Sequence, residues 1–93
     1  MDFEWDLRKN AENIHKHGVS FEEAREAFLD GGHVLLHDVK HSTRAERRYF
    51  LLGVVAGRVL TVRFAMREET IRIFGAGYWR KGKELYEQAH SQE

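Results

Sequence analysis

The chain has 93 residues, with 15 Lys and Arg against 15 Asp and Glu, six His, no Cys and no Pro. At this length we expect one domain over residues 1–93, and the lack of Cys excludes a disulfide scaffold or a thiolate zinc site. Hydrophobic residues make up 42% of the chain, too many for a disordered protein. Without a membrane-length apolar run or a signal peptide, the expected location is the cytoplasm, with no membrane contact.

The net charge of zero conceals an asymmetry along the chain. Residues 1–30 hold eight acidic and four basic side chains, whereas residues 39–83 hold eleven basic and three acidic ones. Such polarisation in a small domain favours binding of a polyanion, or of an acidic partner, on one face. The alternative is an ordinary solvated surface on which Arg pairs with the acidic half of the same chain.

Two helices are predicted in the first third of the chain. The first runs from about Asp6, a suitable N-cap, to His17, with Gly18 at the position that ends a helix. A narrow apolar stripe at i, i+4 and i+7 is formed by Leu7, Ala11 and Ile14. The second begins at Ser20, which has capping-box spacing to Glu23, and ends at Gly31-Gly32. Its apolar stripe comprises Phe21, Ala24 and Phe28.

Beyond residue 32 the apolar residues recur with a period of two, which predicts strands. The candidates are residues 33–37, 48–55, 58–66 and 70–76, with residues 3–5 as a further edge strand. Ala56-Gly57 is a tight connection that joins two of them as a hairpin. In the second hairpin strand, Arg63 is expected on the same face as Thr61. The opposite face is expected to carry Leu60, Val62, Phe64 and Met66.

A last helix, about residues 78–89, completes the expected α+β fold. This fold has two N-terminal helices, an antiparallel sheet of about four strands and a C-terminal helix, with the helices packed on one sheet face. Gly82 lies inside the last helix, where Gly costs about 1 kcal/mol relative to Ala. Another element is therefore expected to approach the helix closely at this position.

The six His side chains do not form a recognisable metal motif. His15 and His17 are two residues apart on a helix and do not share a face. His33 and His37 would lie roughly 13 Å apart along a strand. The segment 77–83 has the glycine and lysine spacing of a phosphate-binding loop, but Glu84 follows where Ser or Thr is needed. We therefore expect no metal and no cofactor.

Three arginines lie within predicted strands, namely Arg48, Arg63 and Arg72. Arg63 and Arg72 alternate with large apolar neighbours, so both should project from the face opposite the core. Arginines on an open sheet face form a phosphate cradle, because guanidinium binds phosphate in a bidentate manner. The alternative is a ladder of cross-strand ion pairs with Glu46, Glu68 or Glu69.

Aromatic and basic side chains alternate at the start of the last helix. They are Tyr78, Trp79, Arg80, Lys81 and Lys83, followed by Tyr86. Single-stranded RNA binders combine stacking surfaces with positive charge in this way. The alternative is that Trp79 and Tyr86 complete the core beneath the helix, which we favour for Tyr86.

Several blocks of the sequence form a specific combination. The opening block comprises Phe3-Glu4-Trp5-Asp6, Lys9, Asn13 and Lys16-His17-Gly18-Val19-Ser20-Phe21-Glu22-Glu23-Ala24. A central His41-Ser42, the Arg72-Ile73 strand and a closing Glu84-Leu85-Tyr86-Glu87 follow it. Over residues 3–87 this combination resembles the BrnT family of bacterial type II toxins. Two positions depart from the family pattern. Arg47 stands where many members have Glu, and Gly75-Ala76-Gly77 replaces Ser-Ala-Arg.

The resemblance implies a RelE-like fold and a metal-independent endoribonuclease that cleaves RNA and arrests growth. It also implies a BrnA-like antitoxin with a ribbon-helix-helix DNA-binding domain. The two proteins would form a heterotetramer that contacts operator DNA only through the antitoxin. Because of the two departures, an alternative is a weak or inactive toxin-like binding protein that acts through its antitoxin complex. A third alternative is a stand-alone RNA-binding module.

Metal-free RNA cleavage needs groups for proton transfer and cations for the crowded phosphorane. We assign charge stabilisation to Arg48, Arg63 and Arg72. We assign proton transfer to Glu46 or His41, since an unperturbed His titrates near pH 6.5 and can act as acid or base. The residues expected to hold the RNA are Arg80, Lys81 and Lys83 for the backbone, and Trp79 or Tyr78 for a stacked base.

Overall fold

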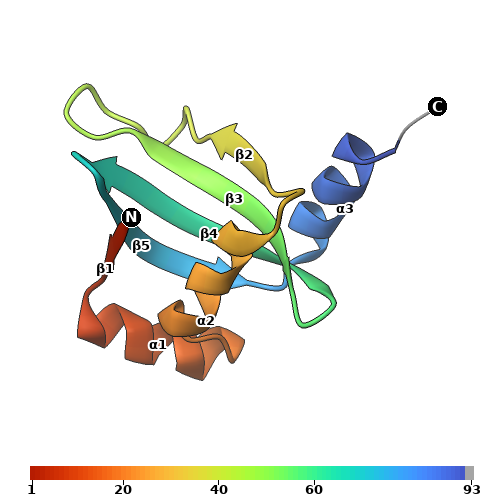
Figure 1. Ribbon diagram of the computed structural model, residues 1–93. Helices are drawn as coiled ribbons and strands as arrows, with labels where there is room; N and C mark the ends of the chain where they lie inside the picture. Colours follow the sequence, from red (N-terminus) through yellow and green to blue (C-terminus); the bar gives the residue numbers. More distant parts are fainter. Residues whose placement is uncertain (92–93) are drawn as a thin grey trace.

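Five strands form one mixed sheet in the computed structural model, which describes residues 1–91 (Figure 1). They are β1 (Asp2–Glu4), β2 (Val34–His37), β3 (Arg48–Val55), β4 (Arg58–Arg67) and β5 (Thr70–Gly77), in the sheet order β1-β5-β4-β3-β2. β1 pairs with β5 in parallel and the other pairs are antiparallel. The α+β class and the hairpin are confirmed, but the prediction of about four antiparallel strands is wrong in detail, because residues 2–4 add a parallel edge.

The helices are α1 (Leu7–His17), α2 (Phe21–Arg25) with a 3₁₀ continuation η1 (Glu26–Leu29), and α3 (Arg80–Ala89). The predicted caps are present: Asp6 accepts a hydrogen bond from the backbone N–H of Arg8, and the Ser20 hydroxyl accepts one from that of Glu23. Gly18 ends α1 with a left-handed φ of 69°. α3 begins two residues later than predicted. Within residues 1–91, none of these helices is long and apolar enough to cross a membrane.

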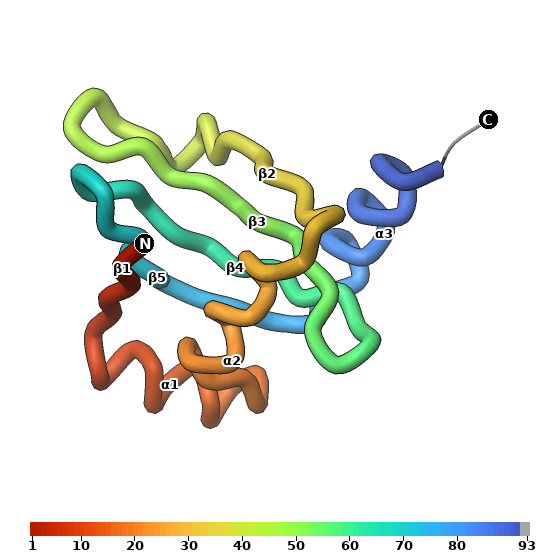
Figure 2. Tube along the Cα trace, viewed as in Figure 1, coloured from red at the N-terminus to blue at the C-terminus, as the bar shows by residue number. Residues whose placement is uncertain are grey.

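The helices cover both faces of the sheet, so the prediction that they share one face is wrong. η1 packs on the face that carries Gly53, where a Cβ would overlap the carbonyl oxygen of Ala27. α3 packs on the opposite face, where a Cβ at Gly82 would overlap Thr61 Oγ1. Gly53 pairs with Leu60 of β4, and Thr61 is the next residue along that strand, so the two contacts lie on opposite faces. Figure 2 follows the chain from β1 through α1 and α2 to β2 at the far edge.

The core lies between α2, η1 and the first of these faces. Its largest fully buried side chains include Phe21 of the predicted helical stripe, and Leu60, Ile71 and Ile73 of the period-two pattern. The expected apolar stripe of α1 is not part of it, because Leu7 is 79% and Ile14 45% exposed. This helix turns a polar residue, Asn13, toward the sheet instead.

Asn13 joins α1 to an open stretch of the β5 edge. β1 pairs with β5 only from Thr70 to Arg72, so further along the strand this edge lacks a partner strand. There the Asn13 side chain donates to the Ala76 carbonyl oxygen at 2.9 Å and accepts from the Ala76 N–H at 3.3 Å. A second donation reaches the Val19 carbonyl oxygen at 2.9 Å. One buried amide therefore replaces the missing strand at this position and sets the position of α1.

The close packing of α3 predicts the effect of Gly82→Ala. The Cβ would overlap Thr61 Oγ1 and lie 3.3 Å from Leu52 Cδ2, so we expect a loss of about 1–3 kcal/mol despite the better helix propensity of Ala. Chemical denaturation measures the loss. Thr61 Oγ1 has no hydrogen-bond partner within residues 1–91, so in a Thr61→Ala background the loss should shrink. Gly31→Ala is the matched control, because a Cβ there meets nothing within 4 Å. A Gly82→Ala protein as stable as the wild type would contradict this packing.

The Asn13 amide predicts a second stability effect. Asn13→Ala leaves the polar atoms of Ala76 and the Val19 carbonyl without their partner. Unsatisfied buried groups cost about 1–3 kcal/mol each, so we expect a loss of roughly 2–4 kcal/mol in the free energy of unfolding. Glu12→Ala, an exposed change on the same helix, should stay within about 0.5 kcal/mol. Equal losses for the two variants would show that the amide has no special role.

Candidate active site

A groove of about 280 Å³ lies between α1 and the sheet face that carries the strand arginines. We call it the basic groove. It is lined by Lys9, Glu12, Asn13, Lys16, His17, Arg48, Arg63, Phe74, Gly75 and Trp79. Four of these side chains are Lys or Arg and only one is acidic, so the groove has the charge of an anion-binding site.

One face of α1 forms a wall of this groove. Lys9, Asn13 and Lys16 follow one another at i, i+4 and i+7, a spacing that brings side chains onto one helix face. The two lysines were not assigned to the site from the sequence, although this spacing could have identified them. Because the Asn13 amide fastens the helix to β5, it also sets how close both ammonium groups lie to the sheet.

A β-bulge shapes the floor of the groove. Arg63 of β4 pairs with Gly75 and Phe64 pairs with Ile73, so Phe74 is an extra residue in β5. The Arg48 guanidinium lies 4.1 Å from the centre of the Phe74 ring, a cation–π contact. At Gly75 the strand has no side chain, and the Arg63 guanidinium lies beside it, 3.6 Å from where a Cβ would be.

The three strand arginines share the face opposite the core, as predicted, but they do not form one cradle. Arg48 and Arg72 both lie opposite Ala65, one on each side of β4. Arg72 does not line the basic groove, and it forms an ion pair with Glu4 at 3.2 Å. Arg63 lines the groove and forms no ion pair with any residue in the range 1–91. Its guanidinium is therefore the one of the three that is available to a ligand.

Glu46 is held by two arginines. Its Oε1 accepts from Arg48 Nε at 3.0 Å, and its Oε2 accepts from Arg67 at 2.8 Å. The hydrogen bonds from Arg67 and from Arg48 hold the pKa of Glu46 below its usual value. Both carboxylate oxygens are engaged and the group is acidic, which makes Glu46 a weak proton acceptor. Arg48 therefore forms the ion pair with Glu46 that we considered as the alternative to a phosphate cradle. Glu68 and Glu69 form no ion pair within the described chain.

His41 lies in the loop between β2 and β3, beside a residue that the sequence analysis missed. Its Nδ1 is 2.9 Å from Oδ2 of Asp38, a carboxylate whose side chain is only 9% exposed. The imidazole is half exposed, and its Nε2 has no hydrogen-bond partner among residues 1–91. The i, i+3 spacing of Asp38 and His41 is the signal that could have revealed the pair.

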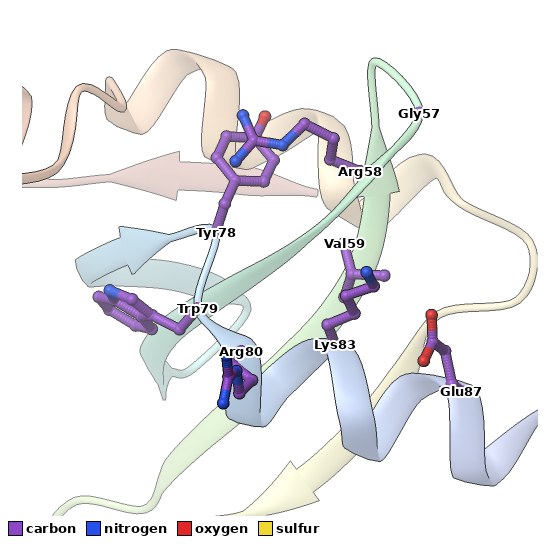
Figure 3. Close-up of a pocket in the computed structure, with 8 residues that line it drawn as sticks. All are labelled: Gly57, Arg58, Val59, Tyr78, Trp79, Arg80, Lys83 and Glu87. Atoms are coloured by element: carbon purple, nitrogen blue, oxygen red, sulfur yellow. The ribbon is translucent and has the colours of Figure 1, made fainter.

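The predicted RNA-holding residues lie mostly around a second hollow of about 270 Å³ (Figure 3). It is lined by Gly57, Arg58, Val59, Tyr78, Trp79, Arg80, Lys83 and Glu87. Lys81 is exposed on α3 and lines neither the hollow nor the basic groove. Trp79 lines both, so its indole stands where they meet.

The aromatic residues near α3 have different roles. The Tyr78 hydroxyl donates to Glu23 at 2.5 Å, and the Arg58 guanidinium lies 4.1 Å from its ring centre. Burial and the Glu23 hydrogen bond raise the pKa of Tyr78 to about 12. The Tyr86 hydroxyl donates to Asp30 at 2.7 Å, so this residue connects α3 to the loop before β2. Tyr86 is only partly buried and is not part of the core cluster, so its contact differs from the core packing we favoured.

Gly77 explains one departure from the family pattern. A Cβ at this position would lie 2.6 Å from Trp79 Cζ2 and Nε1, so the indole occupies the space that a side chain at residue 77 would need. The arginine expected there cannot coexist with Trp79 in this position. The cations of the groove instead come from α1, β3 and β4.

No three His, Asp or Glu side chains in the described part of the chain are grouped closely enough to hold a metal ion. The chemistry available in the basic groove is that of guanidinium and ammonium groups, two aromatic surfaces and a nearby Asp–His pair. Such a set can bind phosphates and can exchange protons at one imidazole.

Comparisons with known proteins identify the family to which the chain belongs. A search among curated proteins found no match. Residues 5–83 match a family model described as the ribonuclease toxin, BrnT, of type II toxin–antitoxin systems. The match covers most of the chain and includes α1 and all four strands that follow it, so this protein belongs to the BrnT family of ribonuclease toxins.

Proposed function

We propose that this protein is a metal-independent endoribonuclease that cleaves single-stranded RNA in the basic groove and thereby arrests growth. The observation that carries the proposal is Arg63, which forms no ion pair with any of residues 1–91 and lies in a groove lined by three further cations. A free guanidinium in such a site suits a phosphodiester. Membership of a ribonuclease toxin family supports the same reaction class.

The proposed reaction is an internal transesterification. The RNA 2′-oxygen attacks the adjacent phosphorus and loses its proton to a base, while the bond from phosphorus to the 5′-oxygen breaks and that oxygen gains a proton. The products are a 2′,3′-cyclic phosphate and a free 5′-hydroxyl. Arg63 and Arg48 stabilise the phosphorane, because fixed donors aimed at developing charge lower the barrier. Arg72 supports the site indirectly through Glu4.

His41 is the better of the two proton-transfer candidates. Glu46 has both oxygens bound by arginines and a lowered pKa, so it accepts a proton poorly at neutral pH. Its role in this account is to orient Arg48. The Nε2 of His41 has no hydrogen-bond partner in the described part of the chain, and imidazole can act as both acid and base near neutrality.

The flanking RNA would follow the positive surface from the basic groove past Trp79 into the second hollow. Trp79 offers a stacking surface where the two meet, and Arg80 and Lys83 offer contacts to the backbone. Lys81 would contribute only at longer range. Tyr78, which is bonded to Glu23 and covered by Arg58, would shape the hollow rather than stack a base.

The partner proposed for this toxin is a BrnA-like ribbon-helix-helix antitoxin. A type II toxin family implies a protein antitoxin. We propose a heterotetramer that contacts operator DNA only through the antitoxin, in the cytoplasm, with residues 1–93 as a single toxin domain. A partner that silences the basic groove is expected to present acidic or apolar groups to it.

The arginines provide the test. Purified protein is incubated with single-stranded RNA in EDTA, and initial rates are compared between variants. Arg63→Ala should lower the rate by about 100-fold or more, with little change in stability, because Arg63 has no ion pair to lose among residues 1–91. Arg72→Ala should lower the rate less and the stability more, because it leaves Glu4 unpaired.

Arg8→Ala is the matched control, since this arginine is 88% exposed and, among the residues that the structure describes, pairs with Glu12 alone on its own helix. It should cleave at the wild-type rate. Cleavage abolished by EDTA would overturn the metal-free mechanism. A wild-type protein that leaves RNA intact but arrests growth would favour the alternative of a toxin-like binding protein.

A further inference from the structure

Hydrogen bonds of the backbone and of the Ser42 hydroxyl close the loop of residues 38–47. The Asp38 N–H donates to the Arg48 carbonyl oxygen at 2.8 Å. The Ser42 hydroxyl donates to the Asp38 carbonyl oxygen at 2.7 Å and accepts from the Arg48 N–H at 2.8 Å. These bonds tie the end of β2 to the start of β3, so the residues between them keep a fixed position relative to Arg48.

Within this loop the Asp38 carboxylate is directed at His41. Oδ1 accepts from the His41 N–H at 3.2 Å, and Oδ2 lies 2.9 Å from the imidazole Nδ1. Asp38 is only 7% exposed, and within residues 1–91 its one ion-pair partner is His41. Burying a carboxylate costs free energy of folding unless the group is well paired. The contact with the imidazole therefore matters for keeping the Asp38 carboxylate in this position.

Asp38 also lies beside the arginines of the proposed active site. It lines a small hollow together with Arg48, Tyr49, Arg63, Phe64 and Phe74. Arg48, Arg63 and Phe74 also line the basic groove. Asp38 therefore adjoins the groove, and His41 is joined to it through its contact with Asp38.

We propose that Asp38 is a positioning residue for RNA cleavage, which fixes the His41 ring with its proton on Nδ1 and leaves Nε2 free to exchange a proton with the substrate. The inference rests on the proposed function and deepens it. When Nε2 takes the proton of the 2′-hydroxyl, the carboxylate stabilises the resulting imidazolium without being protonated itself. Carboxylates that hold a histidine act in this way in hydrolytic triads and behind metal-bound histidines.

A spectroscopic measurement tests the orientation without any assay of cleavage. The ¹⁵N shifts of the imidazole nitrogens distinguish the two neutral tautomers, and a His41→Gln variant assigns the signals. In the wild-type protein we expect the Nδ1-protonated form, which is the minor form of histidine in water. In Asp38→Asn we expect a large shift toward the Nε2-protonated form. A wild-type His41 that carries its proton on Nε2 would overturn the proposal, even if Asp38→Asn does not fold.

Cleavage rates test the functional half. Asp38→Asn should lower the rate on single-stranded RNA by roughly 10-fold or more, since groups that orient metal-bound histidines contribute about 10- to 100-fold and the triad carboxylate contributes more. In a His41→Gln background the same change should cause no further loss, because Asp38 acts through His41. Asp2→Asn, an exposed aspartate on β1, is the matched control and should leave the rate unchanged.

The outcomes separate this inference from the proposed function. If the wild-type protein cleaves RNA and Asp38→Asn cleaves it equally fast, Asp38 has no positioning role. If Asp38→Asn lowers the rate equally with and without His41, Asp38 supports the loop alone and the proposal is wrong. If the wild-type protein does not cleave RNA, the proposed function fails first and the positioning role fails with it.

Discussion

The hydrogen bonds between Asn13 and Ala76 determine where the site forms. β5 loses its neighbour β1 after Arg72, and the Asn13 side chain supplies both a donor and an acceptor to the strand edge that remains. This attachment holds α1 beside the bulged part of β5. The gap between that helix and the sheet face becomes the basic groove. A helix attached by apolar contacts alone could slide along the strand, whereas a paired amide fixes one register.

The net charge of zero is a sum over parts of the chain that the fold rearranges. Glu4 of the acidic first third pairs with Arg72, and Glu23 accepts from Tyr78, so some acidic groups do offset the basic part. Lys9 and Lys16 come from the acidic third, yet both line the basic groove. The groove is therefore cationic because the fold brings these Lys and Arg side chains together. The charge counts of residues 1–30 and 39–83 show only that acidic and basic side chains can be separated in space.

Much of the fold follows from local rules. Asp6, Ser20 and Gly18 are caps that act within a few residues, and the strand pattern separates core residues such as Leu60 from Arg63. What the sequence could not show depends on distant pairing. The parallel β1 edge, the bulge at Phe74 and the placement of α3 on the opposite face each arise from contacts between segments far apart in the chain. The prediction from the narrow apolar stripe of Leu7, Ala11 and Ile14 was wrong for the same reason, because the long-range hydrogen bonds of Asn13 determine which side of α1 faces the sheet.

The sequence predicted the kinds of side chain in the candidate site better than it predicted which residues form the site. Arg48 and Arg63 line the basic groove, and Asp38, the partner of His41, lies beside them. Arg48 is also paired with Glu46, and the pairs of Glu46 with Arg67 and of Arg72 with Glu4 depend on contacts that the fold creates. The central claim is that the groove cleaves RNA through its own 2′-hydroxyl. The most direct measurement is to compare one RNA oligonucleotide with a copy that carries a single 2′-deoxy sugar at the cleaved position. We expect a 2′,3′-cyclic phosphate and a 5′-hydroxyl from the first and no cleavage at that position in the second. Cleavage at the deoxy position, or a 5′-phosphate product, would contradict the account.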